Sequence, residues 1–353
     1  MSEDIAFNIA VYAKTHVGMV RPGNEDNFLV LNLTTADTWT PEIDGDPATN
    51  LTTFSQSYYG SLVAVTDGMG GALAGEVASH HSVQCVRDRM LELQASPTYA
   101  KIPFHERLRL SIELANLYIY QMSLKRPECA GMGATFTAAG LFGTSAYFGQ
   151  VGDSRAYLIR QGQVQQVTRD QSLVGQLVEA GHITEEEAEK HTYKNVILQA
   201  LGAAPNVNVV VDRVALRDLD IIVLCSDGLS NKVRPDEMLR LIDKSHSLKE
   251  ACDLLVELAN QRGGEDNITV LVAQVTGGRL QPVESVGLRE TVPLTSGDSP
   301  HERWGAETLP RDPTIPYEVD LDLVDDEEET IPPTDRLDQD DQSDRPTDKL
   351  GSE

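Results

Sequence analysis

Basic residues are scarce in this 353-residue sequence, and their scarcity excludes one large class of function. The chain has 29 Lys and Arg against 55 Asp and Glu, which gives a formal net charge of −26. A protein that neutralises nucleic-acid phosphates needs a basic face, and a strongly acidic chain is repelled by anionic membranes as well. We therefore expect neither nucleic acid nor membrane as a partner.

Cysteines and long apolar runs are also lacking. Cys85, Cys129, Cys225 and Cys252 stand far apart without a C-x-x-C pair, which argues against a zinc cage and against a disulfide framework. The longest apolar run, residues 221–225, is too short to cross a bilayer. The N-terminus lacks the basic and apolar regions of a signal peptide. These absences predict a soluble protein in the reducing cytoplasm.

The acidic excess is unevenly distributed along the chain. Residues 279–353 contain 7 Lys and Arg against 21 Asp and Glu, and such a composition cannot bury a core. The remaining length suits one large folded domain. We predict a domain over residues 5–278 and a disordered acidic tail over residues 279–353.

Hydrophobic patterning within the domain alternates groups of short strands with pairs of helices. Strands are predicted at 8–13, 28–33, 61–65, 207–211, 221–225 and 268–275, with an antiparallel meander over 135–167. Helical spacing marks 83–93, 104–124, 235–242 and 248–260, and returns within 170–202. Residues 34–57 lack periodicity and are interpreted as a loop insertion that either gates access to a site or is merely tolerated. The pattern favours an α+β fold of two antiparallel sheets covered by helices.

Two acidic motifs occur twice, each time at the end of a predicted strand. Asn24-Glu25-Asp26-Asn27 precedes one strand as Glu265-Asp266-Asn267 precedes another, and Thr66-Asp67-Gly68 follows one strand as Ser226-Asp227-Gly228 follows another. If these ends converge, the carboxylates repel one another unless cations bridge them. The glycine after Asp67 and after Asp227 lets backbone approach a ligand closely.

Oxygen ligands without cysteine select hard cations such as Mg²⁺ or Mn²⁺. Two such ions make a nucleophile from water and neutralise a phosphoryl group. Arg21, four residues before Glu25, is suited to gripping two phosphate oxygens. Asp153, at a turn of the meander, is a fifth acid of the same kind.

Each motif also has an ordinary explanation. Asp-Gly is a common turn dipeptide, and the Glu-Asp pairs are compatible with solvated loop charges, so the hypothesis depends on their joint occurrence. Gly68-Met69-Gly70-Gly71 mimics a dinucleotide-binding loop, but Leu73 stands where the third glycine belongs, and Asp67 would repel a pyrophosphate.

Six motifs, taken in order, resemble those of the bacterial branch of the metal-dependent protein phosphatases, the PPM or type 2C family. They are Arg21-x-x-Asn24-Glu25-Asp26, Asp67-Gly68-Met69-Gly70-Gly71, Gly131-Met132-Gly133-Ala134-Thr135, Gly152-Asp153-Ser154-Arg155, Ser226-Asp227-Gly228-Leu229 and Glu265-Asp266-Asn267. The resemblance covers about residues 8–276 and implies a four-layer α-β-β-α sandwich. It also implies hydrolysis of phosphoserine and phosphothreonine in proteins by in-line attack of a metal-bridging hydroxide, opposing bacterial Ser/Thr kinases.

The same resemblance implies roles for the acids. Asp67 bridges two Mn²⁺ or Mg²⁺ ions, Gly68 offers its carbonyl to one of them, and Asp227 and Asp266 hold the other. The Gly131–Thr135 motif serves backbone packing.

Further residues receive roles around this pair of ions. Glu25 and Asp26 ligate the first metal directly or through water, and Arg21 binds the substrate phosphate, so that Arg21 and Asp26 count as catalytic. Asp153 with Asp227 forms a third, weaker metal site. Residues 170–202 correspond to a mobile flap that influences substrate choice.

Three positions depart from the family pattern. Met69 stands where eukaryotic members carry a histidine proposed as general acid, Ala72 where many bacterial members have histidine, and Asn231 where others have an additional Asp. The leaving alkoxide then needs a proton from metal-bound water or another residue, and the third metal site is left in doubt. The possible histidine substitutes are His16, His80, His81, His182 and His191.

The tail repeats a Thr-apolar-Pro unit. The copies are Thr291-Val292-Pro293, Thr308-Leu309-Pro310, Thr314-Ile315-Pro316 and Thr330-Ile331-Pro332, three of them preceded by Glu. One interpretation is a solubilising tail with chance repetition. The other is a set of phosphoacceptors or docking motifs for a partner kinase or a phosphothreonine-binding domain.

Two rival functions accompany the phosphatase hypothesis. A pseudoenzyme of the same fold would bind phosphoproteins or a kinase without hydrolysis, but Asp67, Asp227, Asp266 and Arg21 are all present, which favours activity. A Ca²⁺-binding scaffold would need the D-x-D-x-D-G spacing that these loops lack.

Overall fold

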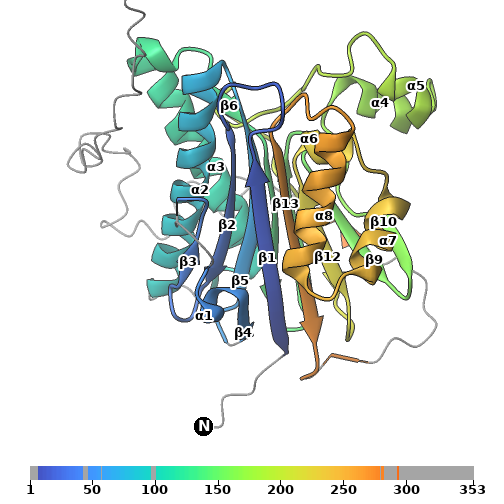
Figure 1. Cartoon of the computed structure of the whole chain (residues 1–353). Helices are drawn as coiled ribbons and strands as arrows, with labels where there is room; N and C mark the ends of the chain where they lie inside the picture. Colours follow the sequence, from blue (N-terminus) through green and yellow to red (C-terminus); the bar gives the residue numbers. More distant parts are fainter. Residues whose placement is uncertain are drawn as a thin grey trace, which may run out of the picture. The chain divides into compact units, whose positions relative to one another are not determined.

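Two antiparallel β-sheets lie face to face between two pairs of helices (Figure 1). The structure, a computed structural model, describes residues 7–42, 47–56, 58–96, 101–278, 280–281 and 292–293. By its contacts the chain divides into residues 1–311 and 312–353, and the described residues all belong to the first unit. The predicted α+β sandwich is confirmed. Among the described helices, none combines the length and apolarity that a bilayer-spanning segment needs.

The first sheet has eight strands and the second has six. The first runs β14 (Val292–Pro293), β11 (Val210–Ala215), β8 (Ser145–Val151), β7 (Phe136–Phe142), β5 (Ser61–Met69), β2 (Asp26–Asn32) and β3 (Thr38–Trp39), with β6 (Gly133–Ala134) paired to β5. The second runs β10 (Gln163–Gln166), β9 (Arg155–Arg160), β12 (Ile221–Cys225), β13 (Ile268–Thr276), β1 (Asn8–His16) and β4 (Thr53–Ser55).

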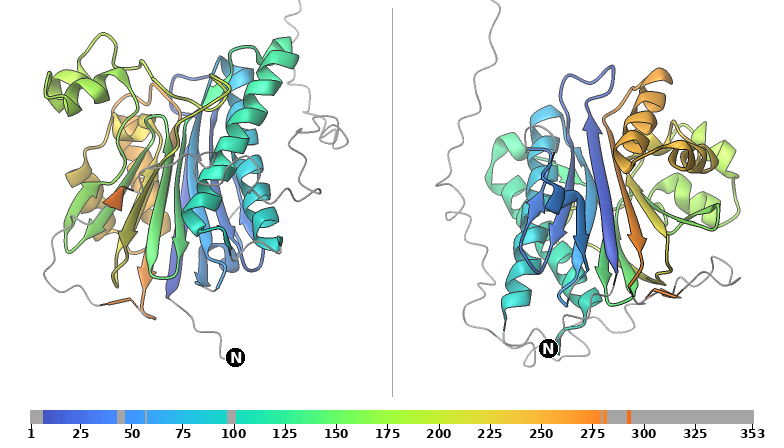
Figure 2. Two further views of the ribbon diagram at one scale, coloured as in Figure 1. Left: turned by 180° about the vertical axis from the view of Figure 1, so that it is seen from behind. Right: turned by 60° about the horizontal axis from the view of Figure 1, so that its bottom comes forward.

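Helices cover the outer faces of both sheets, as the views from behind and from below also show (Figure 2). Helices α2 (Ala72–Ala95) and α3 (Phe104–Lys125) pack on the first sheet, and α7 (Pro235–Lys244) and α8 (Leu248–Gln261) lie over the second. These four helices confirm the predicted ones. Shorter segments are α1 (Thr49–Thr52), α4 (Leu173–Glu179), α5 (Glu185–Glu189), α6 (Asp227–Ser230) and the 3₁₀ turn η2 (Pro127–Cys129).

The main core lies between the two sheets. Phe28 of β2, Val63 of β5 and Leu271 of β13 are buried there together, because alternate side chains of each strand point to the same face. A second core, which includes Val270, Val272 and Leu255, fills the space between the second sheet and α7 and α8. Burial on both faces fixes the register of the central strands.

The predicted meander over residues 135–167 was wrong in one respect, since its strands belong to two sheets. β7 and β8 pair in the first sheet, whereas β9 and β10 pair in the second. The chain crosses between the sheets at Gly152–Ser154, where Gly152 has φ +97 and an added Cβ would lie 2.7 Å from the Thr135 side chain. The crossing places Asp153 at the junction of the two sheets.

The described part of residues 34–57, namely 34–42 and 47–56, is not the aperiodic loop that the sequence suggested. It includes β3, which pairs with β2, and β4, which pairs with β1, so the insertion extends one edge of each sheet. Trp39 is buried and contacts Tyr12 and Phe28 edge-on, with ring centroids 5.4 and 5.2 Å apart. Part of the insertion therefore belongs to the core of the sandwich.

Two further expectations differ from the structure. Within residues 170–202 only α4 and α5 are helical, and the stretch from His191 to Gly202 is not. The strand predicted at 207–211 begins at Val210.

Packing also continues beyond residue 278, because Leu280 is buried against the main core. The predicted tail otherwise lies outside the described residues, except for Gln281 and β14.

A buried ion pair fixes the sheets at the end where β12 begins. Arg160 donates from Nη2 and Nε to the two carboxylate oxygens of Asp220, at 2.6 and 2.8 Å. Asp220 is completely buried and also accepts from the backbone N–H of Arg217 at 2.7 Å. Arg160 Nη2 donates in addition to the carbonyl of Ala215 at 2.8 Å. The pair thereby joins β9, β11 and β12.

Asp220→Ala is expected to lower the free energy of unfolding by about 3–5 kcal/mol, because it leaves the Arg160 charge buried without its partner. Equilibrium urea unfolding measures the effect. The matched control is Asp236→Ala, which breaks the exposed pair with Arg240 on α7 and should cost less than about 1 kcal/mol. Equal losses in the two variants would contradict the stabilising role of the buried pair.

Candidate metal centre

The repeated acidic motifs meet at one end of the sandwich, two from each sheet. Asp26, at the start of β2, lies directly opposite Asp67 of β5 in the strand register. Asp227 begins α6 immediately after β12, and Asp266 stands two residues before β13, which pairs with β12. The repeated acidic motifs therefore do converge, which is the condition that the metal-site hypothesis required.

Hydrogen bonds link the two sheets at this end. Ser226 Oγ donates to Asp26 Oδ2 at 2.7 Å and accepts from the Thr269 N–H at 2.9 Å. Asn267 Oδ1 accepts from the Glu25 N–H at 2.8 Å, while its Nδ2 donates to two carbonyls of the 17–23 loop at 2.8 and 2.9 Å. Sequence reasoning missed both roles. The signal was available, because Ser226 and Asn267 belong to the repeated motifs.

The Gly131–Thr135 motif does more than the predicted backbone packing. Thr135 Oγ1 accepts from the Asp67 N–H at 2.9 Å, and the Thr135 N–H donates to the Asp67 carbonyl at 2.8 Å. Its hydroxyl also lies 2.6 Å from Ser154 Oγ. One threonine thus connects the strand that carries Asp67 with the crossing that carries Asp153.

Glycine is required beside the acids because backbone segments approach each other closely. A Cβ on Gly68 would lie 2.0 Å from the Gly75 carbonyl oxygen, and one on Gly228 would lie 1.9 Å from that of Asn267. A Cβ on Gly75 would meet Glu25 Oε2 at 2.0 Å. These contacts bring Glu25 and the start of α2 to the same place as Asp67.

The acids strongly disfavour one another's charge. Burial, reinforced by repulsion from Asp227 and Asp266, raises the pKa of Asp26 to about 7. Burial and repulsion from the neighbouring acids raise the pKa of Asp67 well above its ordinary value. Burial with repulsion from Asp227 raises that of Asp153 to about 7, and the pKa of Asp227 is also raised by burial and by Asp266. This electrostatic cost is what bound cations would remove.

Several of these acids bond to neighbouring side chains. Arg21 Nη2 donates to Asp266 Oδ2 at 2.9 Å, and Asn231 Nδ2 donates to Asp227 Oδ2 at 3.1 Å. As they stand, no three Asp, Glu, His or Cys side chains in the described part of the chain are arranged to hold a metal ion. The donor set nevertheless fits a hard cation, because it offers oxygen ligands only and because Asp26 Oδ1 is buried without a hydrogen-bond partner.

Arg21 and Glu25 occupy the rim of this acidic centre. The side chain of Arg21 is 49% exposed, and its pKa is raised mainly by Asp266 and further by Glu25 and Asp67. The pKa of Glu25 is raised, chiefly by burial. The guanidinium is thus accessible from solvent while it remains within the field of the acids.

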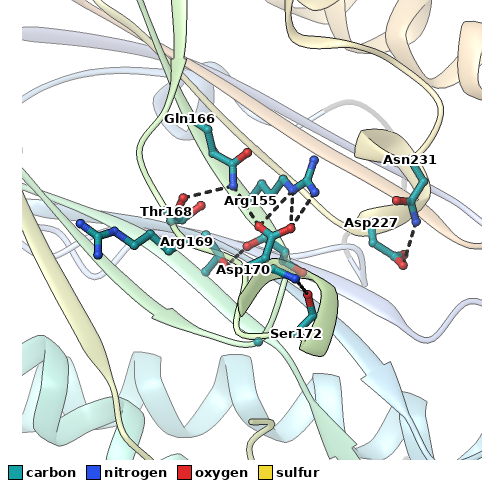
Figure 3. A network of polar contacts seen from close by, with 12 residues as sticks. Arg155, Gln166, Thr168, Arg169, Asp170, Ser172, Asp227 and Asn231 are labelled. Carbon is teal, nitrogen blue, oxygen red and sulfur yellow. Dashed lines mark hydrogen bonds and ion pairs between the residues drawn. The ribbon is translucent and has the colours of Figure 1, made fainter. Parts of the chain in front are cut away.

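The predicted flap is attached to the centre at both ends. Arg155 binds Asp170 through Nη2 and Nε, at 2.6 and 2.9 Å from Oδ2 (Figure 3). At the other end, Leu201 exchanges backbone hydrogen bonds with Ala134 at 2.8 and 3.1 Å. Figure 3 also shows Asn231 donating to Asp227 nearby. At the third metal site expected from Asp153 and Asp227, the Asn231 amide therefore already donates a hydrogen bond to one oxygen of Asp227.

Four of the five histidines considered as proton donors have other contacts. His80 Nδ1 lies 2.9 Å from Glu42 Oε1 in the insertion, and His81 contacts the ring of Tyr118. His16 Nδ1 accepts from the Gly18 N–H at 2.9 Å. His191 lies in the flap, where its Nδ1 accepts from the Tyr193 N–H at 3.2 Å.

Comparisons with known proteins identify the family and the fold of this chain. The family model for protein phosphatase 2C matches residues 45–261. The serine/threonine phosphatase Stp of Listeria welshimeri is 39% identical over 213 residues, which cover 60% of this chain and 84% of that protein. The S. agalactiae serine/threonine phosphatase structure has a TM-score of 0.63 at 30% identity and covers 75% of this chain and 98% of that one.

A further solved structure is the catalytic domain of the serine/threonine phosphatase PstP in complex with two manganese ions. It has a TM-score of 0.60 at 30% identity and covers 77% of this chain and 100% of that one. The matched residues 45–261 make up more than half of the chain and include Asp67, Asp153 and Asp227. This chain therefore belongs to the protein phosphatase 2C family of serine/threonine phosphatases.

Proposed function

We propose that the chain hydrolyses phosphoserine and phosphothreonine in proteins, with two Mn²⁺ or Mg²⁺ ions held at the junction of the sheets. The observation that carries this proposal is the gathering of Asp26, Asp67, Asp227 and Asp266 from both sheets, with Arg21 exposed at their rim. The pKa values of Asp26, Asp67 and Asp227 are raised by burial and by their acidic neighbours, and groups with such raised pKa values concentrate at functional sites.

We propose the same metal ligands that the resemblance in sequence implies. Asp67 would bridge the ions, the Gly68 carbonyl and Asp227 and Asp266 would complete their ligand sets, and Glu25 and Asp26 would act directly or through water. When bound, two such ions lower the pKa of water and neutralise the phosphoryl oxygens. Asp153 with Asp227 is the proposed third, weaker site.

Arg21 is proposed to bind the substrate phosphate. Its bond to Asp266 holds the guanidinium over the acids, and that bond is exposed. When Asp266 serves as a ligand, the Arg21 fork is free to donate to two phosphate oxygens. Met69 has no proton to give, so the leaving alkoxide is proposed to take its proton from water.

Removal of divalent metal should abolish turnover of p-nitrophenyl phosphate and of a phosphothreonine peptide, and Mn²⁺ should restore it. Asp67→Asn and Asp227→Asn should lower kcat/KM by more than the ~10–100-fold typical of outer partners of a metal site, because they remove ligand charge. Asp236→Asn, an exposed change on α7, is the control. Full EDTA-resistant activity, or activity of either variant equal to that of the control, would refute the proposal.

Ser226→Ala should raise the Mn²⁺ concentration for half-maximal activity by about 10–100-fold, because Ser226 holds the Asp26 carboxylate. Activity at saturating Mn²⁺ should recover. Ser82→Ala is the matched control, a buried serine that bonds only within α2. A variant that is less stable but has an unchanged Mn²⁺ titration would show that the hydroxyl is structural only.

We also propose that the enzyme opposes Ser/Thr kinases and that its tail threonines are phosphoacceptors or docking motifs for a kinase or a phosphothreonine-binding domain. The support is compositional, since four Thr-apolar-Pro units recur in an acidic segment. Thr291, Thr308, Thr314 and Thr330 lie outside the described residues.

Phosphopeptide mapping after incubation with the cognate Ser/Thr kinase should find phosphate on at least one of these four threonines. Asp67→Asn prevents the enzyme from removing its own label and is the background of choice. Modification confined to other residues of the chain would reject the phosphoacceptor role.

A further inference from the structure

β11 is the last long strand of the first sheet, and only one side of it is fully paired. Its six residues, Val210 to Ala215, all pair with β8. On its other side the described residues offer only β14, in which Val292 lies opposite Arg213 and Pro293 opposite Asp212. An edge strand of this kind presents backbone groups that accept another extended segment.

The chain is also held in place shortly before β14, at Leu280 and Gln281. Leu280 is buried against the main core, and the carbonyl of Gln281 accepts from the Asp218 N–H at 3.2 Å. Arg217 Nη1 donates to Gln281 Oε1 at 2.6 Å. Gln281 is thus held at the turn that joins β11 to β12, eleven residues before Val292.

We propose that the outer edge of β11 is a docking site for the apolar-Pro part of a Thr-apolar-Pro unit, and that its resident occupant is Val292–Pro293 of the same chain. Val292 is β-branched and suits an extended strand. Pro293 has no N–H to offer, so it is compatible with an outermost strand but not with a further strand beyond it. Val292 and Pro293 therefore cover the edge at Asp212 and Arg213 and are suited to an outermost strand.

The number of residues between Gln281 and each Thr-apolar-Pro unit explains why the first unit, and not a later one, supplies the residues at the edge. Val292 follows Gln281 by eleven residues, whereas Leu309 of the next unit follows it by twenty-eight. The entropic cost of closing a chain segment grows as (3/2)RT times the logarithm of its length in residues. The shorter tether alone favours the 291–293 unit by about fourfold.

Engineered disulfides in the full chain test the assignment. Residues opposite each other in antiparallel strands have Cα atoms close enough for a disulfide. Arg213→Cys with Val292→Cys should form an internal cross-link under mild oxidation, detected by peptide mass spectrometry. Arg213→Cys with Leu309→Cys is the matched control and should give at least fourfold less.

A second pair, Asp212→Cys with Pro293→Cys, tests the same register if the first pair is poorly folded, and thermal unfolding identifies such a failure. Equal cross-linking by the test and control pairs would overturn the proposal. Disulfide-linked dimers in place of the internal bond would also overturn it, since a second copy would then cover the edge. The cross-link does not depend on catalysis, so it stands or falls separately from the phosphatase activity.

Discussion

Mutual repulsion among buried and half-buried carboxylates is the constraint on which the rest of this structure depends. Asp26, Asp67 and Asp227 sit where the two sheets meet, and burial together with their neighbours' charges raises the pKa of each. No sheet alone would gather them. The strand register sets Asp26 against Asp67, and packing of the sandwich core adds Asp227. The free energy of apolar burial therefore opposes the repulsion that cations would relieve.

The links that resist this repulsion run between the sheets. Ser226 bonds Asp26, and Asn267 bonds the backbone of Glu25, so the second sheet positions two acids of the first. At the opposite end of β12, Asp220 is held by Arg160. Because β12 runs directly from Asp220 toward Ser226, the buried ion pair fixes the far end of the strand that delivers the site. Strand β12 thus connects a residue that stabilises the fold, Asp220, with one that positions the site, Ser226.

Repetition made the site predictable, because the same acidic motif at two strand ends indicates convergence without knowledge of the topology. Helices such as α3 and α8 followed from their apolar spacing. The crossing at Gly152–Ser154 was not predictable, since pairing within one sheet and transfer to another give the same short-strand pattern. Trp39 was missed for a related reason: one aromatic side chain in a polar stretch gives no periodic pattern, and its burial depends on contacts with Tyr12 of β1 and Phe28 of β2 that only the assembled sandwich supplies.

The acidic excess of the chain has two physically different parts. Acids of the 279–353 segment are spread along 75 residues of sequence, and those acids lie outside the described residues. The acids of the candidate metal centre are brought together by the fold. Solvent screens their repulsion only weakly there, and a bound cation would reduce it. Within the acidic segment, Val292 and Pro293 pair with β11, and a proline-ended unit allows one such pairing but no more. An acidic tail with proline in each repeat can therefore cover a sheet edge without starting an aggregate.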